Sequence, residues 1–437
     1  MKHRRLGLIL AGVLLLSSCS DTEGTDSTTN STTPAEPVEL TFRLWDEGAA
    51  EAYAESFDAF TEENPNITVT IDLVDPKDYW DSARGDFDSG GIADVFWVDR
   101  TNLSDLATNG HLVEIADSGN WSEILVELFT IEDELWAVPQ MWNSTALYYN
   151  RDLYQDVDVS ISNLEWAPDG GDGDTLLDAA LTLTTDMDGN TAGSDDFDAS
   201  NIETYGFAAD YELHSAFVPF LLQAGGSLQD SAGAFAFATE EGEQAAQYLV
   251  DLTQEHHVSP PAEDAYTDPN HNQDLFTSGN LVLYQSNSAR LSDIAAQSDF
   301  SWGVAPLVGG PEGEVAVVDG IGVAGNANSD HPEETELLLN WLGTTGGMQP
   351  LADNGIGFPA TTSGQDSYVN YWAKQGVDVS AFIESTLHGV PITTHDFDIH
   401  HAIMEMEPII GRMLNGEIPV DEALRQAQEA GNSALDL

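Results

Sequence analysis

The chain has 437 residues, with 76 aspartates and glutamates against 12 lysines and arginines, and its formal net charge is −64. So few basic side chains exclude a nucleic-acid-binding surface, which needs clustered cations to displace counterions, and they disfavour an anionic membrane surface. Hydrophobic residues make up 41% of the chain, which is enough for real cores, and the length predicts two lobes or domains.

The charge also predicts the kind of solvent that surrounds the protein. After residue 18 the only lysines are Lys77 and Lys374, and the other cations are arginines. Repulsion among so many carboxylates is tolerable where salt screens it, since the Debye length falls to about 3 Å at 1 M ionic strength. We therefore expect a halophilic protein; the alternative is an ordinary acidic exported protein.

The N-terminus predicts export. Residues 1–5 are basic, residues 6–16 are an unbroken apolar run, and two serines then lead to Cys19, the single cysteine. Such a run is too short to span about 30 Å of hydrocarbon, so residues 1–18 are expected to be a signal peptide. Its route, general or twin-arginine, stays open. A lone cysteine also allows no intramolecular disulfide and no cysteine-based metal site.

Residues 19–37 are rich in serine and threonine, and from Ser20 on they hold no apolar residue larger than alanine. Such a composition predicts a flexible tether, whose typical reach is roughly 20–25 Å.

From Val38 onward the pattern alternates between strands and helices, which predicts an α/β fold with a parallel sheet. The expected strands of the first half are 38–45, 67–74, 93–98 and 145–150, and the expected helices are 50–64 and 102–109. Residues 169–200 are dense in Asp, Gly, Ser and Thr and are expected to form a surface excursion on a second lobe. Further on we expect helices at 212–224, 240–255, 333–342 and 420–430 and strands at 281–284, 302–306 and 315–323.

Signatures of catalysis and of metal binding are weak. The chain contains no HExxH, Walker or GxSxG motif, and carboxylate pairs are too common here to single out an acid and a base. Asp186, Asp188 and Asn190 have the spacing of a calcium loop, but Gly189 is misplaced for one and no glutamate closes it, so we favour a solvated acidic turn. No cofactor is expected.

Tryptophans at strand ends give a stronger signal. Trp45 ends the first strand, Trp97 lies near the end of the third, and Trp142 precedes the crossover strand. An indole face can stack on a sugar ring while polar neighbours bind the hydroxyls, although core packing is an equal alternative for any single tryptophan. The polar neighbours are Asp46, Glu47, Asp99, Arg100 and Asn143.

Several segments together resemble one family, the extracellular solute-binding lipoproteins of carbohydrate ABC importers, of the maltose-binding-protein type. Phe96, Trp97, Asp99 and Arg100 match a family segment whose Trp, Asp and Arg contact sugar, and Cys19 lies where that family has a lipidated cysteine. The segments that carry the resemblance are 92–100, 106–115, 138–143, 147–153, 276–283, 302–307 and 420–428.

The resemblance implies a two-lobed periplasmic-binding-protein fold with a hinge between discontinuous lobes. Residues 38–149 and 299–349 would form the first lobe, and 150–298 and 350–437 the second. The ligand-binding residues would be those named above, together with Asn287, Arg290, Asp319 and Gly320, which are placed by loop position alone. Ile403 and Met404 stand where the maltose type has Trp and Tyr, so maltodextrin is not implied.

The function implied by the resemblance is capture of a sugar or oligosaccharide and its delivery to an ABC permease, without chemistry on the solute. The protein would be an exported monomer anchored by a lipid on Cys19. Two alternatives remain open: an exported polysaccharide-degrading enzyme that uses a carboxylate pair, and the same fold binding a non-sugar such as a polyamine.

Overall fold

The computed structural model describes residues 36–435 except 117–118, 156, 169, 171–172, 211–212, 214, 269, 387–388 and 392–398. The expected signal peptide, Cys19 and nearly all of the tether lie outside the described residues. Residues 37–437 form one compact unit.

The strands are β1 (Val38–Leu44), β2 (Ile67–Leu73), β3 (Val95–Val98), β4 (Thr130–Ile131), β5 (Glu134–Leu135), β6 (Val138–Asn150), β7 (Thr185–Asp186), β8 (Ile202–Ala209), β9 (Leu281–Asn287), β10 (Trp302–Ala305), β11 (Val317–Gly325), β12 (Phe358–Pro359) and β13 (Val390–Pro391). The helices are α1 (Glu47–Glu63), α2 (Pro76–Ser89), α3 (Arg100–Thr108), α4 (Glu123–Leu128), α5 (Arg151–Tyr154), α6 (Thr175–Leu183), α7 (Phe217–Gln223), α8 (Glu240–Gln254), α9 (Ala262–Thr267), α10 (His271–Thr277), η1 (Ser288–Arg290), α11 (Leu291–Gln297), α12 (Pro332–Leu342), α13 (Thr345–Asp353), α14 (Gln365–Lys374), α15 (Ser380–Thr386), α16 (Ile399–Leu414) and α17 (Val420–Ala434).

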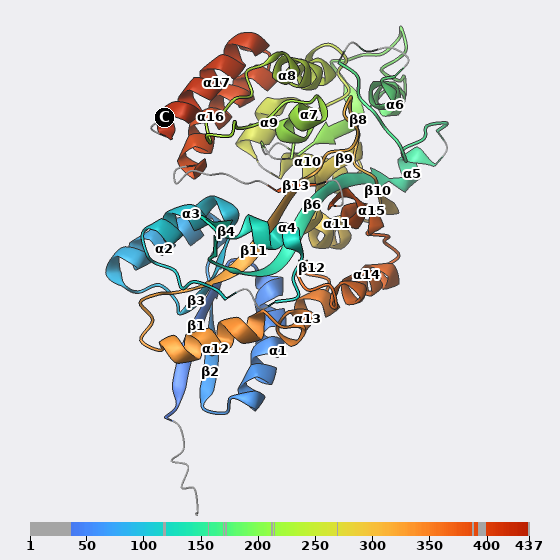
Figure 1. Cartoon of the computed structure of the whole chain (residues 1–437). Coiled ribbons are helices and arrows are strands. Elements are labelled where there is room, and N and C mark those ends of the chain that lie inside the picture. Colours follow the sequence, from blue (N-terminus) through green and yellow to red (C-terminus); the bar gives the residue numbers. More distant parts are fainter. Residues whose placement is uncertain are drawn as a thin grey trace, which may run out of the picture. The chain divides into compact units, whose positions relative to one another are not determined.

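One long strand, β6, connects two halves of a mixed sheet. The strand order is β2-β1-β3-β11-β6-β9-β8-β7. β1 pairs in parallel with β2 and β3, and β8 pairs in parallel with β9. The first part of β6 pairs with β11 and β12, and its last part pairs with β9 and β10, so the strand passes from one half to the other (Figure 1).

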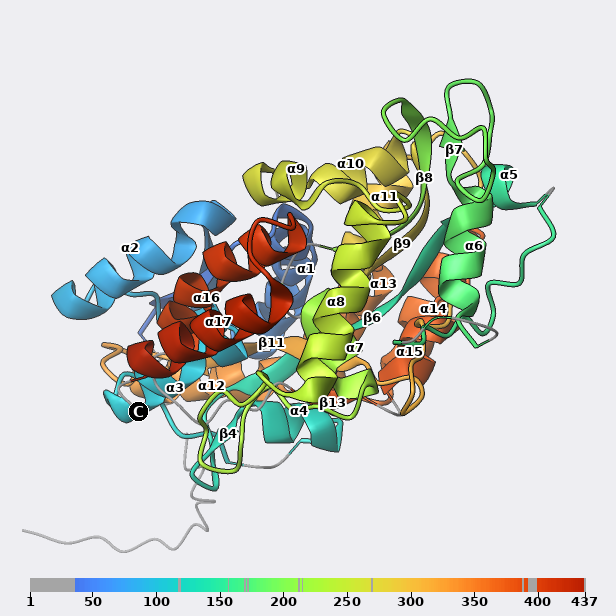
Figure 2. The same cartoon turned by 90° about the horizontal axis from the view of Figure 1, so that it is seen from above.

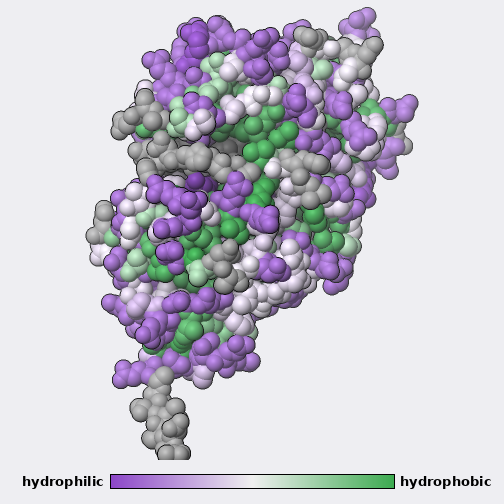
Figure 3. Space-filling model, viewed as in Figure 1, coloured by the Kyte–Doolittle hydropathy of each residue, from purple (hydrophilic) through white to green (hydrophobic). Residues whose placement is uncertain are grey.

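Two hydrophobic cores lie on the two halves. The first contains buried side chains of β1, β3, α1, α12 and α13, and the second contains those of α6, α7, α8, α16 and α17. Helices α16 and α17 lie side by side and pack against α8 (Figure 2). Hydrophilic residues cover much of the visible face, with apolar surface gathered in bands between them (Figure 3). Within the described residues, no helix is long and apolar enough to cross a membrane.

The expected lobe segments differ from this packing at several places. Tyr284 and Leu291, expected in the second lobe, belong to the first core, and Ala305 and Val308, expected in the first lobe, belong to the second. Residues 350–437 are predicted to be a single second-lobe segment, but Leu351, Tyr368 and Phe382 belong to the first core. The reason is that α13 packs against α1 and α15 packs against β6. The first core therefore extends through α15, and only α16 and α17 join the second core.

Further local differences concern helices that the sequence does not predict, among them α2, α6, α13, α14 and α15. Residues 169–200 are not only a surface excursion, because Leu176, Ala180 and Leu183 on α6 are buried in the second core. Helix α2 falls in a stretch for which the sequence predicts no element. It begins at Pro76 after an Asp75 cap, and it ends at Gly90, whose φ of 75° is the left-handed conformation that terminates helices.

Candidate functional site

An aromatic cluster lies where β1 and β3 end. The carboxyl ends of parallel strands meet at one edge of a sheet, which is where α/β folds place ligands. Trp45 follows β1, and its ring centroid lies 4.9 Å from that of Trp97 and 4.7 Å from that of Tyr79. Trp80, next to Tyr79 on α2, lies 6.4 Å from Trp45. Trp45, Tyr79, Trp80 and Trp97 are called the aromatic cluster below.

Two members of the cluster carry its accessible surface. Trp45 and Trp80 are half-buried, whereas Tyr79 and Trp97 are only 1% and 2% exposed. The indole nitrogen of Trp80 donates to an Asp99 carboxylate oxygen at 3.1 Å. Indole faces beside a carboxylate offer a sugar both a stacking surface and a hydrogen-bond acceptor for its hydroxyls.

The other two tryptophans singled out from the sequence are packed in the core. The Trp97 indole nitrogen donates to the Tyr53 hydroxyl at 3.2 Å. Trp142 is 6% exposed and packs edge-on against Phe358, with ring centroids 4.9 Å apart. Core packing is the alternative to sugar stacking that the sequence left open for any single tryptophan. Stacking of a ligand on Trp97 or Trp142 stays a prediction, and it would require the residues that cover these rings to move.

The charged residues beside the cluster have structural partners. Asp46 caps α1 by accepting from the Ala49 amide at 2.7 Å, and Glu47 is exposed in the first turn. Asp99 caps α3 by accepting from the Asn102 amide at 2.9 Å. Arg100 is 5% exposed and donates to Ser104 at 2.7 Å, and burial lowers the pKa of its guanidinium to about 10. It therefore stays charged at neutral pH.

A second group of predicted residues gathers in the middle of β6. Asn143 lies opposite Asp319 in the register with β11, and it accepts a hydrogen bond from the Ser288 hydroxyl at 3.3 Å. Asp319 accepts from the Gly320 amide at 2.7 Å, and a side chain at Gly320 would meet the Met141 carbonyl.

The predicted second-lobe residues lie where β9 ends. The Asn287 side chain caps η1 by accepting from the Ala289 amide at 3.0 Å. Arg290 approaches Asp210, which follows β8, at 3.4 Å and donates to Asn270 at 2.9 Å. Asp210 is 1% exposed and also accepts from Ser286 at 2.8 Å. Arg290 and Asp210 thus belong to one hydrogen-bonded network at the carboxyl ends of β8 and β9.

Sequence reasoning missed Tyr79, Trp80 and Asp210. The available signal for the first two was an aromatic pair one turn after Pro76, directly following a strand. Asp210 follows β8, a strand that the sequence analysis did not identify.

In the acidic turn at residues 186–190, the Asp186 carboxylate accepts hydrogen bonds from neighbouring residues of the chain. Asp186 is 1% exposed, and its oxygens accept from the amides of Asp188, Asn190 and Asp198 and from the Asn190 side chain. The turn is therefore not solvated at Asp186. Hydrogen bonds from the Asn190 side chain and the Asp198 amide, above all, lower the pKa of Asp186 to about 2. Among the residues that the structure describes, no group of three His, Cys, Asp or Glu side chains could hold a metal ion.

Asp186→Asn is expected to lower Tm at pH 7, because an amide cannot accept from all these donors. A carboxylate with a lowered pKa stabilises the fold above about pH 4, and this contribution is lost as the pH falls toward 2. The difference from wild type should therefore shrink over that range in scanning fluorimetry at constant NaCl. Asp188→Asn, at an exposed side chain, is the control. An equal effect of Asp188→Asn, or a Tm increase with CaCl2 that Asp186→Asn abolishes, would contradict this assignment.

Comparison with known proteins assigns the class. Residues 55–376 match the family described as bacterial extracellular solute-binding protein. UspC of M. tuberculosis is 36% identical in a superposition that covers 91% of this chain and 100% of that one, with a TM-score of 0.77. The chain belongs to the bacterial extracellular solute-binding protein family and has the periplasmic-binding-protein fold.

More distant relatives share the fold. An ABC substrate-binding protein from Listeria monocytogenes, solved with cycloalternan, is 18% identical with a TM-score of 0.77, over 92% of this chain and 100% of that one. Maltose-bound MalE3 of T. maritima is also 18% identical, with a TM-score of 0.72, over 91% and 99%. A maltooligosaccharide ABC transporter solute-binding lipoprotein of Streptococcus pneumoniae is 27% identical over 163 residues, 37% of this chain and 38% of that relative. The match thus spans well under half of that curated relative's length.

Proposed function

We propose that this protein is the solute-binding component of an ABC importer, that it captures a sugar or oligosaccharide between its lobes, and that it delivers the solute to a permease. The observation that carries the proposal is the pair of half-buried indoles, Trp45 and Trp80, with the Asp99 carboxylate at the carboxyl edge of the first-lobe sheet. The sugars named with related structures support the same class of solute.

The interactions available at this site can supply the binding free energy of a micromolar ligand. A micromolar affinity corresponds to about −8 kcal/mol. Stacking on two indoles and several hydrogen bonds to charged groups, each contributing about 1–3 kcal/mol, can supply that net value. Asp99 at the first-lobe edge and the Asp210–Arg290 group at the second-lobe edge would provide such bonds. No covalent step is needed, and we propose no enzymatic activity.

The test is a titration of intrinsic tryptophan fluorescence with glucose, maltose, maltotriose and longer oligosaccharides in high salt. We expect a saturable change for at least one sugar, with the sugar recovered unaltered by chromatography. Release of shortened products would favour the polysaccharide-degrading enzyme. A response to spermidine with none to any sugar would favour the same fold binding a polyamine.

We further propose that the protein is exported and anchored to the outer face of the cell membrane through a lipid on Cys19, as a monomer on the tether of residues 19–37. The curated relatives are themselves named lipoproteins. Cys19→Ser is expected to move most of the protein from the membrane fraction to the medium, as measured by immunoblotting of cell fractions. Ser27→Thr, in the tether, keeps both the cysteine and the residues before it and is the comparison variant. Retention of Cys19→Ser in the membrane fraction would overturn the anchor.

A further inference from the structure

Helix α2 carries Trp80 but is itself held by few buried side chains. Of its 14 residues, Tyr79 and Ala83 are the buried ones among those whose side chains the structure describes. Phe87 is half-buried, and its ring centroid lies 5.4 Å from that of Phe96 on β3. Burial of apolar surface supplies most of the packing energy of a surface helix, and here it comes from few side chains, so the position of α2 also depends on specific polar contacts.

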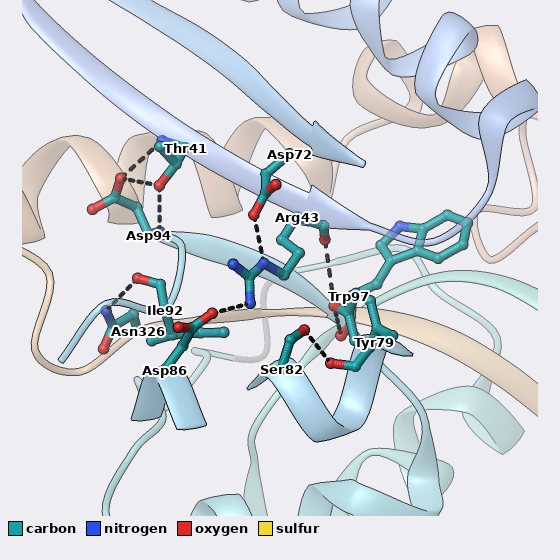
Figure 4. A network of polar contacts seen from close by, with 10 residues as sticks. All are labelled: Thr41, Arg43, Asp72, Tyr79, Ser82, Asp86, Ile92, Asp94, Trp97 and Asn326. Carbon is teal, nitrogen blue, oxygen red and sulfur yellow. Dashed lines mark hydrogen bonds and ion pairs between the residues drawn. The ribbon is translucent and has the colours of Figure 1, made fainter. Parts of the chain in front are cut away.

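Arg43 provides such a contact from β1, the strand next to the edge strand β2 (Figure 4). Its side chain on β1 is 10% exposed, and its guanidinium bonds two carboxylates at 2.6 Å: Asp72 on β2 through Nε and Asp86 on α2 through Nη1. Burial alone would lower the pKa of Arg43, but the hydrogen bonds to Asp86 and Asp72 outweigh that effect and raise it. The guanidinium therefore stays charged and connects β1 and β2 to the last turn of α2.

A second contact fixes the start of the same helix. The Tyr79 hydroxyl donates to the Trp97 carbonyl at 2.8 Å, as Figure 4 also shows, and the Tyr79 ring packs against Trp45. Tyr79 and Asp86 are seven residues apart, about 10 Å along the helix axis. Trp80 lies next to Tyr79. The contacts of Tyr79 and Asp86 together set the direction of the helix, and this direction determines where the Trp80 indole lies relative to Trp45 and Asp99.

We propose that Arg43 is a positioning residue of the solute site, which acts through Asp86 to hold α2 so that Trp80 keeps its place beside Trp45 and Asp99. This inference rests on the proposed function, because it assigns Trp80 to the surface that the solute contacts. Arg43 itself lies behind the cluster, between the sheet and α2, and does not need to touch the solute.

The two carboxylates form a matched pair for testing this inference. Asp72 and Asp86 bond the same guanidinium at the same distance, and their side chains are 43% and 34% exposed. Removing either charge weakens the ion pair of Arg43 to a similar extent, but only Asp86 lies on α2. If Arg43 only stabilises the fold, the two substitutions should have equal effects on α2 and on sugar affinity. If Arg43 positions α2, the loss of the Asp86 carboxylate should have the larger effect on both.

The experiment compares Asp86→Asn with Asp72→Asn in the full chain, at an NaCl concentration where both are folded. In Asp86→Asn we expect amide hydrogen exchange across residues 76–89 to quicken about tenfold and the affinity for maltotriose to fall about fivefold. In Asp72→Asn the exchange rate and the affinity should both stay within about twofold of wild type, although Tm should fall by about as much as in Asp86→Asn. Asp86→Glu, which keeps a carboxylate, should exchange its amide hydrogens across residues 76–89 almost as slowly as wild type.

Equal changes in the two variants, or no change of exchange in Asp86→Asn, would overturn the positioning role. The exchange measurement needs no solute, so it tests by itself whether the ion pair of Arg43 with Asp86 holds α2. If wild type binds neither maltotriose nor any other sugar of the panel, the proposed function fails, and the exchange of residues 76–89 still decides whether Arg43 positions α2.

Discussion

Lowering NaCl from about 2 M to about 0.1 M is expected to lower Tm by roughly 10 °C or more. The chain has 76 carboxylates and only 12 lysines and arginines, so one-to-one ion pairs can neutralise only a small minority of the acids. The Debye length increases to about 10 Å at the lower salt concentration, and carboxylates on neighbouring surface elements then repel each other. Scanning fluorimetry over an NaCl series measures the effect.

Sorbitol at matched osmolality is the control for this salt dependence, because it changes the water activity without screening charge. It is expected to raise Tm far less than NaCl does. KCl should act like NaCl, since screening depends on ionic strength. A Tm that stays constant across the NaCl series would show that the charge of −64 is tolerated without salt, as in an ordinary acidic exported protein.

Strands β1, β2 and β3 of the first lobe could be predicted because their signals are local, but the expected parallel sheet is wrong for β11, which pairs antiparallel with β3 and β6. Burial alternates from Glu39 to Phe42 in β1 and from Ile67 to Ile71 in β2, and β3 is buried at all four positions, so their patterns are present in short stretches of sequence. Helix α2 has a weaker pattern, since Tyr79 and Ala83 are its buried side chains among those described and Phe87, four residues on, is only half-buried. Its ends could have been found from Asp75, Pro76 and Gly90, but the contact that holds it comes from Arg43, more than 30 residues earlier.

The candidate site was only partly predictable for a related reason. Trp45 and Trp97 both lie at strand ends with acidic residues nearby, yet one is half-buried and the other is in the core. What separates them is Tyr53 on α1, whose hydroxyl accepts from the Trp97 indole. Asp210 and Arg290 likewise meet only because β8 and β9 pair in parallel. The exposure of a tryptophan and the meeting of Asp210 with Arg290 both depend on contacts between segments far apart in the chain. Local residue patterns do not specify such contacts.

Trp80→Ala is expected to weaken binding of the preferred sugar at least tenfold, with little loss of Tm. The substitution removes a stacking surface and the donor that orients Asp99, and either loss is worth about 1 kcal/mol or more. Trp80→Phe keeps a ring without the N–H group, so its affinity should fall between those of wild type and Trp80→Ala. Trp45→Ala is expected to match Trp80→Ala in direction. Isothermal titration calorimetry in high salt gives the affinities.

Half-buried tryptophans are the informative targets because their removal separates binding from folding. Alanine at Trp97 would leave a cavity beneath the cluster, and truncating a buried aromatic side chain typically costs 3–5 kcal/mol of stability, so any lost affinity would be ambiguous. Trp341→Phe is the matched control: this half-buried indole donates to Ser56 at 3.0 Å on another part of the lobe, and the substitution should leave affinity unchanged. If Trp80→Ala binds sugar as wild type does, the solute does not contact the aromatic cluster at Trp80. If Trp341→Phe weakens binding as much as Trp80→Ala does, the loss comes from the lobe as a whole.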